Sequence, residues 1–354
     1  MSIMDKLKKN SRSKDSNILS KSKFFNAKDM VPTSVPMINV ALSGRLDGGL
    51  TPGLTVLAGP SKHFKTSFAL LMAAAYLKQY PDSVMLFYDS EFGSPQSYFK
   101  AFNIDPERVF HTPVANVEEL KFDLINQLEQ LDRDDKVIVV IDSIGNIASK
   151  KELEDAKDAK SVADMSRAKA IKSLFRIATP YFTMKDIPCL AINHIYMEQG
   201  MYPKAIVSGG TGIYYSADNI WIVGRRQEKD GTEIKGYHFV INIEKSRFVK
   251  EKSKVPISVS WEGGIMKWSG LLDVAVEGGF VHEGKKGRAK GFFHMDPETG
   301  EVGEKAHYER ETNNAEFWKS IIANPKFGDY VQKKYSIAHA PIMEEDVPEV
   351  EDEV

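Results

Sequence analysis

Short apolar runs alternate with longer stretches of helix-forming composition between residues 37 and 268, and this alternation restricts the folds open to the chain. The runs are almost continuously apolar, which is typical of strands buried on both faces. Such strands, separated by helices, predict a parallel sheet covered by helices on both sides. Ligands of these sheets bind at the carboxyl ends of the strands. We expect strands at 54–58, 84–88, 137–141, 189–193, 220–223 and 237–244, and helices at 66–79, 95–102, 117–131 and 161–182.

The turn after the first expected strand has the layout of a phosphate-binding loop for a nucleoside triphosphate. It closes on Lys65-Thr66 and leads into a helix rich in Ala and Leu. In such loops backbone N–H groups face the phosphates, the lysine neutralises the β and γ oxygens, and the hydroxyl reaches Mg²⁺. The usual pattern has Gly before the lysine, where this chain has Phe64, and an ordinary surface turn remains the alternative for this string alone. The expected nucleotide contacts are Gly59, Pro60, Ser61, Lys62, His63, Phe64, Lys65, Thr66 and Ser67.

Two acidic residues follow later strands. Glu91 lies just beyond the 84–88 strand, where a carboxylate could polarise a water in line with the γ-phosphate as a general base. The alternative is that Asp89 or Glu91 only caps the following turn. The 137–141 strand ends in Asp142-Ser143, and an acid there holds the Mg²⁺ water shell or orients the Thr66 hydroxyl. The loop and both acids, in this order, predict an NTP site with Thr66 and Asp142 at the metal and with Asp142 and Ser143 among the nucleotide contacts.

The 189–193 strand ends in Asn193-His194. This places the His194 imidazole at the same edge of the sheet, where it could donate to the γ-phosphate. A histidine at a strand end is also often a structural hydrogen-bond partner, so both roles stay open.

Two loops carry groups suited to nucleic acid. Residues 195–212 combine aromatic faces, a cation and a glycine cluster, and stacking with backbone contact is how single strands are held without sequence preference. Residues 149–163 begin with two lysines and lead to an arginine, although charge runs of this kind are usually solvated faces. The candidate DNA contacts are Lys150, Lys151, Arg167, Tyr196, Met197, Lys204, Ser208, Gly209 and Gly210.

Charge is concentrated at the two ends of the chain. The first 23 residues hold seven Lys/Arg against two Asp, whereas the last eleven hold seven acids and no base. The net charge is −2, so without this tail the remainder would carry −2 + 7 = +5. A basic body with an acidic tail suits a polyanion binder whose tail competes with the ligand, and two solvated disordered ends are the alternative.

Composition suggests a large α/β core with a small appendage in a chain of 354 residues with 42% hydrophobic content. The single cysteine, Cys189, excludes intrachain disulfides and suits a reducing cytoplasm. The histidines lack metal-ligand spacing, so zinc is not expected, and no apolar run is long enough to span a bilayer. We divide the chain into a flexible basic arm (1–30), a nucleotide-binding core (31–270) that carries the two candidate DNA loops, a small C-terminal α/β unit (271–340) and an acidic disordered tail (341–354).

Together, the phosphate loop, Glu91, Asp142, Asn193-His194 and Ser208-Gly-Gly-Thr resemble the RecA superfamily of DNA strand-exchange ATPases in order and separation. Three strings, at 59–66, 86–93 and 167–176, resemble the recombinases of T-even-type bacteriophages in particular. The resemblance covers roughly residues 20–335. In those phage proteins Phe also stands before the lysine, so Phe64 becomes a mark of the subfamily.

The resemblance implies a RecA-like P-loop fold that uses ATP and Mg²⁺, with roles for individual residues. Glu91 matches the catalytic carboxylate and Tyr98 the aromatic that stacks on adenine. His194 stands where the family usually has a γ-phosphate-sensing Gln. Lys245 and Arg247 match two lysines that reach the ATP of the neighbouring subunit.

The implied activity is ATP hydrolysis to ADP and phosphate, coupled to filaments on single-stranded DNA that pair with homologous duplex DNA. The two loops match the DNA-binding loops, and Phe24 or Phe25 resembles the aromatic that docks the arm onto the next subunit. Further implied partners are a single-stranded-DNA-binding protein and a recombination mediator, in the cytoplasm of the host cell if the chain is phage-encoded.

Two other functions share the same nucleotide core. A hexameric DNA helicase usually carries a separate N-terminal domain, which the short arm of this chain does not supply. A recombinase paralogue would bind ATP and load other proteins without strand exchange, and Glu91 argues modestly against it.

Overall fold

The computed structural model describes residues 2–13, 16–22, 29–157, 166–198, 200–201, 203–230, 233–262 and 264–337. Three predicted features lie outside these residues: the arm aromatics Phe24 and Phe25, the end of the predicted DNA loop at 149–163 (the first loop), and the acidic tail.

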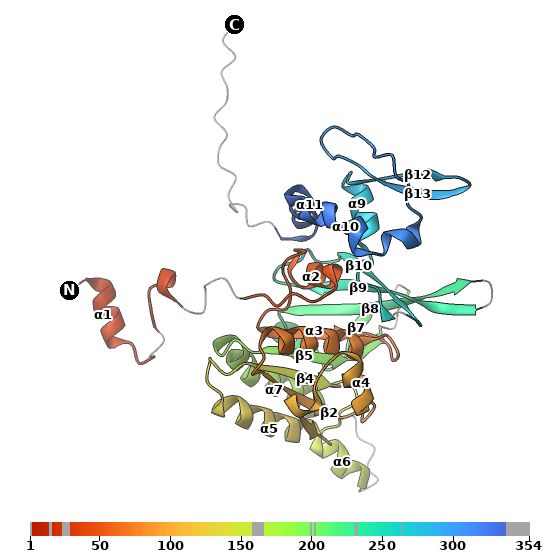
Figure 1. Ribbon diagram of the computed structural model, residues 1–354. Helices are drawn as coiled ribbons and strands as arrows, with labels where there is room; N and C mark the ends of the chain where they lie inside the picture. Colours follow the sequence, from red (N-terminus) through yellow and green to blue (C-terminus); the bar gives the residue numbers. More distant parts are fainter. Residues whose placement is uncertain are drawn as a thin grey trace.

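Nine strands of the described chain form one twisted sheet, in the order β11-β10-β9-β8-β1-β5-β4-β2-β3 (Figure 1). The half from β8 to β3 is parallel, whereas β8 to β11 pair antiparallel. The mostly parallel sheet predicted from the sequence is therefore confirmed and extended by an antiparallel part. The strands are β1 (Gly53–Ala58), β2 (Val84–Asp89), β3 (Val109–Pro113), β4 (Val137–Asp142), β5 (Pro188–Asn193), β8 (Asn219–Asp230), β9 (Glu233–Lys245), β10 (Lys254–Ser260) and β11 (Gly264–Ile265).

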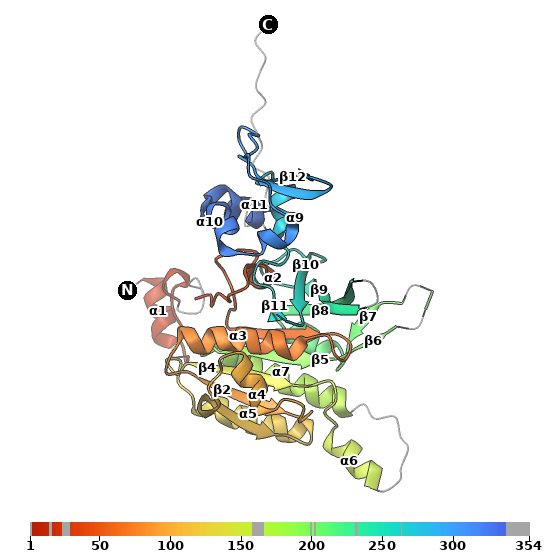
Figure 2. The same ribbon diagram turned by 45° about the vertical axis from the view of Figure 1, so that its right-hand side comes forward.

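Helices cover both faces of the parallel half, as Figure 2 shows. Helix α3 (Lys65–Gln79) packs on one face, and α5 (Val117–Gln130) and α7 (Ser166–Met184) pack on the other. Successive residues of β4 face opposite cores, because side chains alternate along a strand. Burial on both faces explains why these strands are continuously apolar.

The C-terminal unit sits above the antiparallel strands in Figure 1. It packs on α2 (Pro36–Ser43), and its buried Phe280, Trp318 and Phe327 join the same hydrophobic cluster as Ile257 of β10. The core is therefore continuous across residue 270. The unit comprises α9 (Leu271–Glu277), β12 (Val281–Lys286), β13 (Ala289–His294), η3 (Glu309–Thr312), α10 (Ala315–Ala323) and α11 (Pro325–Tyr335).

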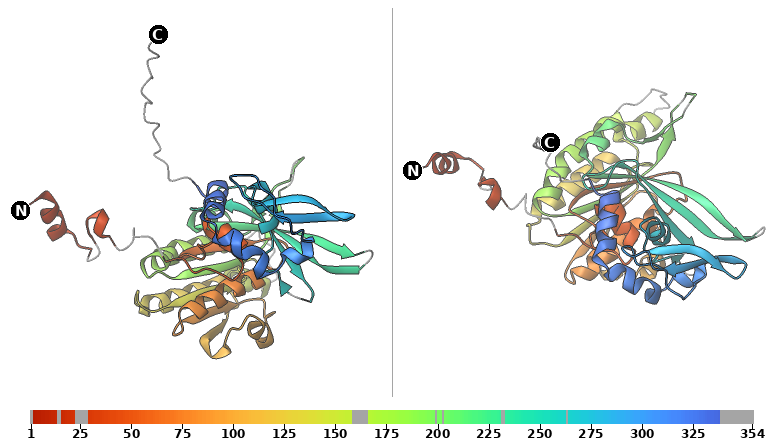
Figure 3. Two further views of the ribbon diagram at one scale, coloured as in Figure 1. Left: turned by 45° about the horizontal axis from the view of Figure 1, so that its top comes forward. Right: turned by 90° about the horizontal axis from the view of Figure 1, so that it is seen from above.

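The N-terminal arm holds a helix, α1 (Ile3–Asn10), which stands away from the body of the molecule (Figures 1 and 3). Ser2 and Asp5 form a capping box that fixes its first turn. None of the α1 residues is buried, and Ile3 and Leu7 are exposed. A short 3-10 turn, η1 (Leu19–Lys21), follows. Helix α1 was not predicted from the sequence, in which its only signal is the Ser2-Asp5 capping box.

Regular structure also appears where the sequence analysis expected loops. Helix α6 (Lys150–Lys157) begins at Ser149, whose hydroxyl accepts from the Glu152 N–H at 3.1 Å. The predicted DNA loop at 195–212 (the second loop) contains a hairpin of β6 (Ile195–Met197) and β7 (Ala205–Val207). Helix α8 (Thr211–Ser216) follows the hairpin. The remaining elements are α4 (Gln96–Ala101) and η2 (Pro106–Arg108). In the part of the chain that the structure describes, no helix has the length and apolar character needed to cross a membrane.

Candidate nucleotide site at the strand ends

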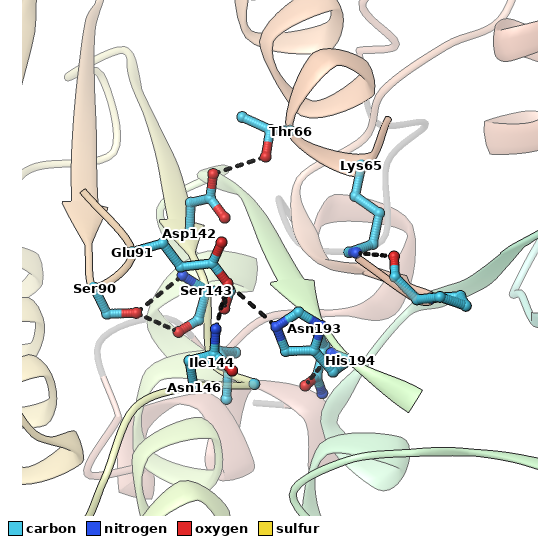
Figure 4. A network of polar contacts seen from close by, with 12 residues as sticks. Lys65, Thr66, Ser90, Glu91, Asp142, Ser143, Ile144, Asn146, Asn193 and His194 are labelled. Atoms are coloured by element: carbon cyan, nitrogen blue, oxygen red, sulfur yellow. Dashed lines mark hydrogen bonds and ion pairs between the residues drawn. The ribbon is translucent and has the colours of Figure 1, made fainter. Parts of the chain in front are cut away.

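The carboxyl ends of β1, β5, β4 and β2 lie level at one edge of the sheet. Ala58 is paired with Asn193, and Asp89 with Asp142. The segments that leave these strands therefore bring together residues that are far apart in sequence, as expected for a parallel sheet. They line a cavity of about 700 Å³, which includes Lys65, Thr66, Glu91, Asp142 and His194 (Figure 4).

Phe64 stands where phosphate loops usually have Gly, and its backbone conformation explains that preference. Phe64 has φ +62° and ψ +16°, in the left-handed region that costs a residue with a side chain roughly 1–2 kcal/mol. Its ring stacks on Phe239 at 5.2 Å between centroids and meets Phe68 edge-on at 5.8 Å. Aromatic packing therefore offsets the strain, and the backbone keeps the course that Gly would give it.

Lys65 lies at the start of α3 and is buried. Its ammonium donates to the Pro60 carbonyl at 2.7 Å, within its own loop. Burial lowers the pKa of Lys65, whereas the nearby Glu91 and Asp142 carboxylates act in the opposite direction. A positive charge held in such surroundings is suited to an anionic ligand.

The residue after Lys65, Thr66, contacts Asp142. The Thr66 hydroxyl donates to Asp142 Oδ2 at 2.8 Å, whereas Asp142 Oδ1 is buried and has no partner among the described residues. Burial raises the pKa of Asp142 to about 6, opposed by the Thr66 hydrogen bond and reinforced by Glu91 and Asp89. A hydroxyl beside an unpartnered buried carboxylate oxygen fits Mg²⁺, which prefers oxygen ligands and keeps several waters. Thr66 and Asp142 are the residues that would hold it.

Glu91 is held by donors from two other strand ends. Its Oε1 accepts from Ser143 Oγ at 2.5 Å and Asn146 Nδ2 at 3.0 Å, and His194 Nε2 lies 3.2 Å away (Figure 4). Three contacts on one oxygen fix the plane of the carboxylate. The sequence analysis proposed Glu91, Ser143 and His194 but missed Asn146, whose only signal is its place three residues beyond Ser143.

Asp89 takes the capping role that the sequence left open between Asp89 and Glu91. Its Oδ1 accepts from the N–H groups of Glu91 and Phe92 at 3.0 and 2.7 Å. Its Oδ2 lies 3.3 Å from His111 Nε2 on β3. The turn that carries Glu91 is therefore fixed by the preceding residue of β2, and the Glu91 side chain remains directed at the cavity.

The far wall of the cavity is aromatic. Tyr98 of α4 lines it and shares a short hydroxyl hydrogen bond with Ser67. Tyr237 and Trp261 line it from the antiparallel strands and the turn after them, and Arg225 lies over the Tyr237 ring at 4.6 Å. The sequence analysis missed the last three, because nothing in the sequence predicts that the antiparallel extension folds back over the loop.

Lys245 and Arg247 do not line this cavity. Lys245 donates to the Tyr214 carbonyl at 2.7 Å, and Arg247 forms an ion pair with Asp218. Lys245 is the last residue of β9, and Arg247 follows it. Their neighbour Asp218 accepts from the Leu54 N–H at the start of β1, whereas the phosphate loop follows the end of β1. A role at the ATP of a neighbouring subunit stays a prediction.

The base of the second loop is tied to the cavity. Asn193 Nδ2 donates to the Ser208 carbonyl at 2.7 Å, and the Ser208 N–H donates to the His194 carbonyl at 2.9 Å. On the hairpin itself, Tyr196 and Met197 are 54% and 56% exposed, so their apolar surface is open to a ligand. Lys204 is exposed as well, and Gly209 and Gly210 take positive φ.

The first loop is less basic than the two lysines at its start suggested. Lys150 and Lys151 are exposed, but α6 balances three lysines against Glu152, Glu154 and Asp155, so its formal charge is zero. Arg167 points inward and donates to the carbonyls of Ile147, Ile144 and Gly145 at 2.7, 2.8 and 2.8 Å. The structure therefore gives Arg167 a main-chain anchoring role, and its DNA contact stays a prediction.

The parallel sheet with a phosphate loop after β1, carboxylates after β2 and β4, and a polar group after β5 defines a RecA-type nucleotide-binding core. RecA proteins are similar across this region. The RecA of Streptomyces avermitilis is 23% identical over 259 residues, covering 72% of this chain and 66% of that protein. The RecA of Chloroherpeton thalassium is 26% identical over 239 residues, covering 66% and 65%. The chain thus spans slightly less than two thirds of these two relatives.

A second similarity extends over nearly the whole chain. The recombination and repair protein of Enterobacteria phage T4 is 51% identical over 337 residues, which are 95% of this chain and 86% of that protein. Residues 268–331 match the C-terminal domain of the bacteriophage T4 recombination and repair protein. The chain belongs to the family of this phage protein, within the RecA superfamily.

Proposed function

We propose that this protein is an ATP-dependent DNA strand-exchange recombinase that forms helical filaments on single-stranded DNA. The observation that carries the proposal is the convergence of Lys65, Thr66, Glu91, Asp142 and His194 on one cavity, in a chain of this family. Homologous duplex DNA is the second substrate, and pairing of the two strands serves recombination, repair and recombination-dependent replication.

Each residue of the cavity has a task in hydrolysis. The N–H groups at the start of α3 and the Lys65 ammonium bind the phosphates, and Tyr98 contacts the base. Bound Mg²⁺ would neutralise charge on the β and γ phosphates. Glu91 accepts the proton of the attacking water, and its three contacts keep it in place for this step.

The two loops link DNA to the nucleotide. Tyr196, Met197 and Lys204 on the hairpin contact the single strand, together with backbone at Ser208, Gly209 and Gly210. Lys150 and Lys151 contribute from the first loop. The His194 carbonyl and side chain connect the hairpin base with Glu91, so the DNA and nucleotide states influence one another. Lys245 and Arg247 bind the ATP of the adjacent subunit, and hydrolysis removes that attraction.

Self-association through the N-terminal arm completes the filament. Phe24 or Phe25 docks onto the next subunit, and the exposed apolar residues of α1 lie in the same arm. A single-stranded-DNA-binding protein and a mediator act with the filament in the cytoplasm, that of the host cell if the chain is phage-encoded.

A DNA strand-exchange assay tests this proposal. Circular single-stranded DNA and homologous linear duplex are incubated with the protein, Mg²⁺ and ATP, and joint molecules and products are resolved on agarose gels. We expect products with the wild type and none with the Lys65→Ala variant or without ATP. Absence of strand exchange by a wild type that hydrolyses ATP would exclude the recombinase.

A further inference from the structure

The segment between β4 and α6 is clamped from the far end of the first loop. Arg167, in the first turn of α7, reaches back and donates to three carbonyls of residues 144–147. A hydrogen bond between the Ser149 and Ser166 hydroxyls, 2.7 Å long, closes the same base. One guanidinium therefore fixes the path of the chain where the first loop begins.

The clamped segment is the one that contacts Glu91. Asn146, between two of the clamped carbonyls, donates to Glu91 Oε1 at 3.0 Å. Gly145 packs against His194 so closely that a Cβ there would lie 2.1 Å from the His194 ring, so the segment also limits the position of a second Glu91 partner. Two of the three contacts on Glu91 Oε1 thus depend on the course of residues 144–147.

We propose that Asn146 and Arg167 are positioning residues for Glu91, with Arg167 acting through the main chain of residues 144–147 and the Asn146 amide. The inference rests on the proposed role of Glu91 in ATP hydrolysis. An amide donor on Oε1 leaves Oε2 available for the attacking water, and small displacements of a reacting group can slow catalysis by about 10²-fold. Neither Asn146 nor Arg167 lines the nucleotide cavity, so both act on turnover and leave ATP binding intact.

A double-mutant cycle on ATP hydrolysis separates this role from a DNA contact. Steady-state hydrolysis is measured at saturating single-stranded DNA for the wild type, Asn146→Ala, Arg167→Ala and the double variant. We expect each single variant to lower kcat about tenfold while KM for ATP stays within about twofold. Because the two residues act in one chain of contacts, the double variant loses about as much as either single variant.

Three further measurements complete the test. Lys78→Ala, which removes an exposed cation from the last turn of α3, keeps wild-type kcat. Asn146→Gln, which retains an amide donor, recovers part of the lost rate. Single-stranded DNA affinity of Arg167→Ala stays within about twofold of wild type, as measured by fluorescence anisotropy.

The alternatives give different results. Wild-type kcat in Asn146→Ala, a roughly hundredfold multiplicative loss in the double variant, or recovery of Arg167→Ala by more DNA would each overturn the inference. If Arg167→Ala fails to fold, as judged by circular dichroism, the comparison of Asn146→Ala with Asn146→Gln decides alone, and equal rates refute the inference. A wild type that hydrolyses no ATP would instead refute the proposed function.

Discussion

The two sides of the nucleotide cavity are built in different ways. The phosphate-loop side consists of consecutive residues, and its shape comes from backbone geometry and from the packing of Phe64 on Phe239. The Glu91 side consists of polar groups that are 52 to 103 residues away from Glu91 in sequence, gathered by the order of the strands. On the proposed function, binding of phosphate is thus a local property of one segment, whereas the geometry for hydrolysis depends on the whole sheet.

Removal of the positive charge of the phosphate loop should have the largest effect. Lys65→Ala should abolish ATP hydrolysis, because phosphate binding loses its only side-chain ammonium in the first turn of α3. The unfolding temperature should stay within a few degrees of wild type, since the substitution removes a buried charge and leaves no packed aromatic unpartnered. Phosphate release and thermal unfolding measure both effects, with Lys78→Ala as a charge-matched control. Wild-type turnover would remove Lys65 from the site.

Glu91→Gln should separate ATP binding, on the phosphate-loop side, from hydrolysis, on the Glu91 side. The amide keeps the size of the side chain but cannot take a proton from water, so we expect hydrolysis slowed by about 10²-fold and ATP bound as before. Equilibrium binding of a fluorescent ATP analogue and single-turnover hydrolysis are the measurements. A variant that loses both binding and hydrolysis would show that the two sides are not separable.

Asp142, which lies between the two sides, should make the stability of the nucleotide-free protein depend on pH. The pKa of Asp142 is about 6 in the folded protein against 3.8 as the ordinary value, so ionisation opposes folding by roughly 3 kcal/mol above pH 6. Stability from this group is lost as pH rises from about 4 to 6. Asp142→Asn should therefore raise the unfolding temperature by several degrees at pH 7.5 and by little at pH 4.5. An equal difference at both pH values would contradict this.

Substitution of Phe64 should have the smallest effect, on stability alone. Phe64→Ala loses the ring but keeps a Cβ at φ +62°, whereas Phe64→Gly loses both the ring and the strain. Both variants should be less stable than wild type, and the Gly variant more stable than the Ala variant by about 1 kcal/mol. Urea unfolding of the nucleotide-free variants measures this. A more stable Ala variant would mean that the backbone at residue 64 is unstrained.

The difference between local contacts and contacts from distant segments also explains which features could be predicted from the sequence. The phosphate loop, the apolar strands and the residues at their ends are local patterns, and the level strand ends then bring Glu91, Asp142 and His194 together. Asn146, Arg225 and the inward turn of Arg167 were missed, because their contacts depend on how distant loops fold back. The helix at 150–157 was missed because a charged stretch without apolar periodicity lacks the signal for a buried face, and its Ser149 cap was overlooked.

Electron microscopy of the protein with single-stranded DNA, Mg²⁺ and ATP tests the central claim most directly. We predict long helical filaments that disappear as ATP is consumed and that persist with Glu91→Gln, because ATP remains bound between subunits. Closed rings would indicate a hexameric helicase, and an absence of any assembly on DNA would indicate a paralogue that does not form filaments. Either of these results would contradict an ATP-dependent recombinase.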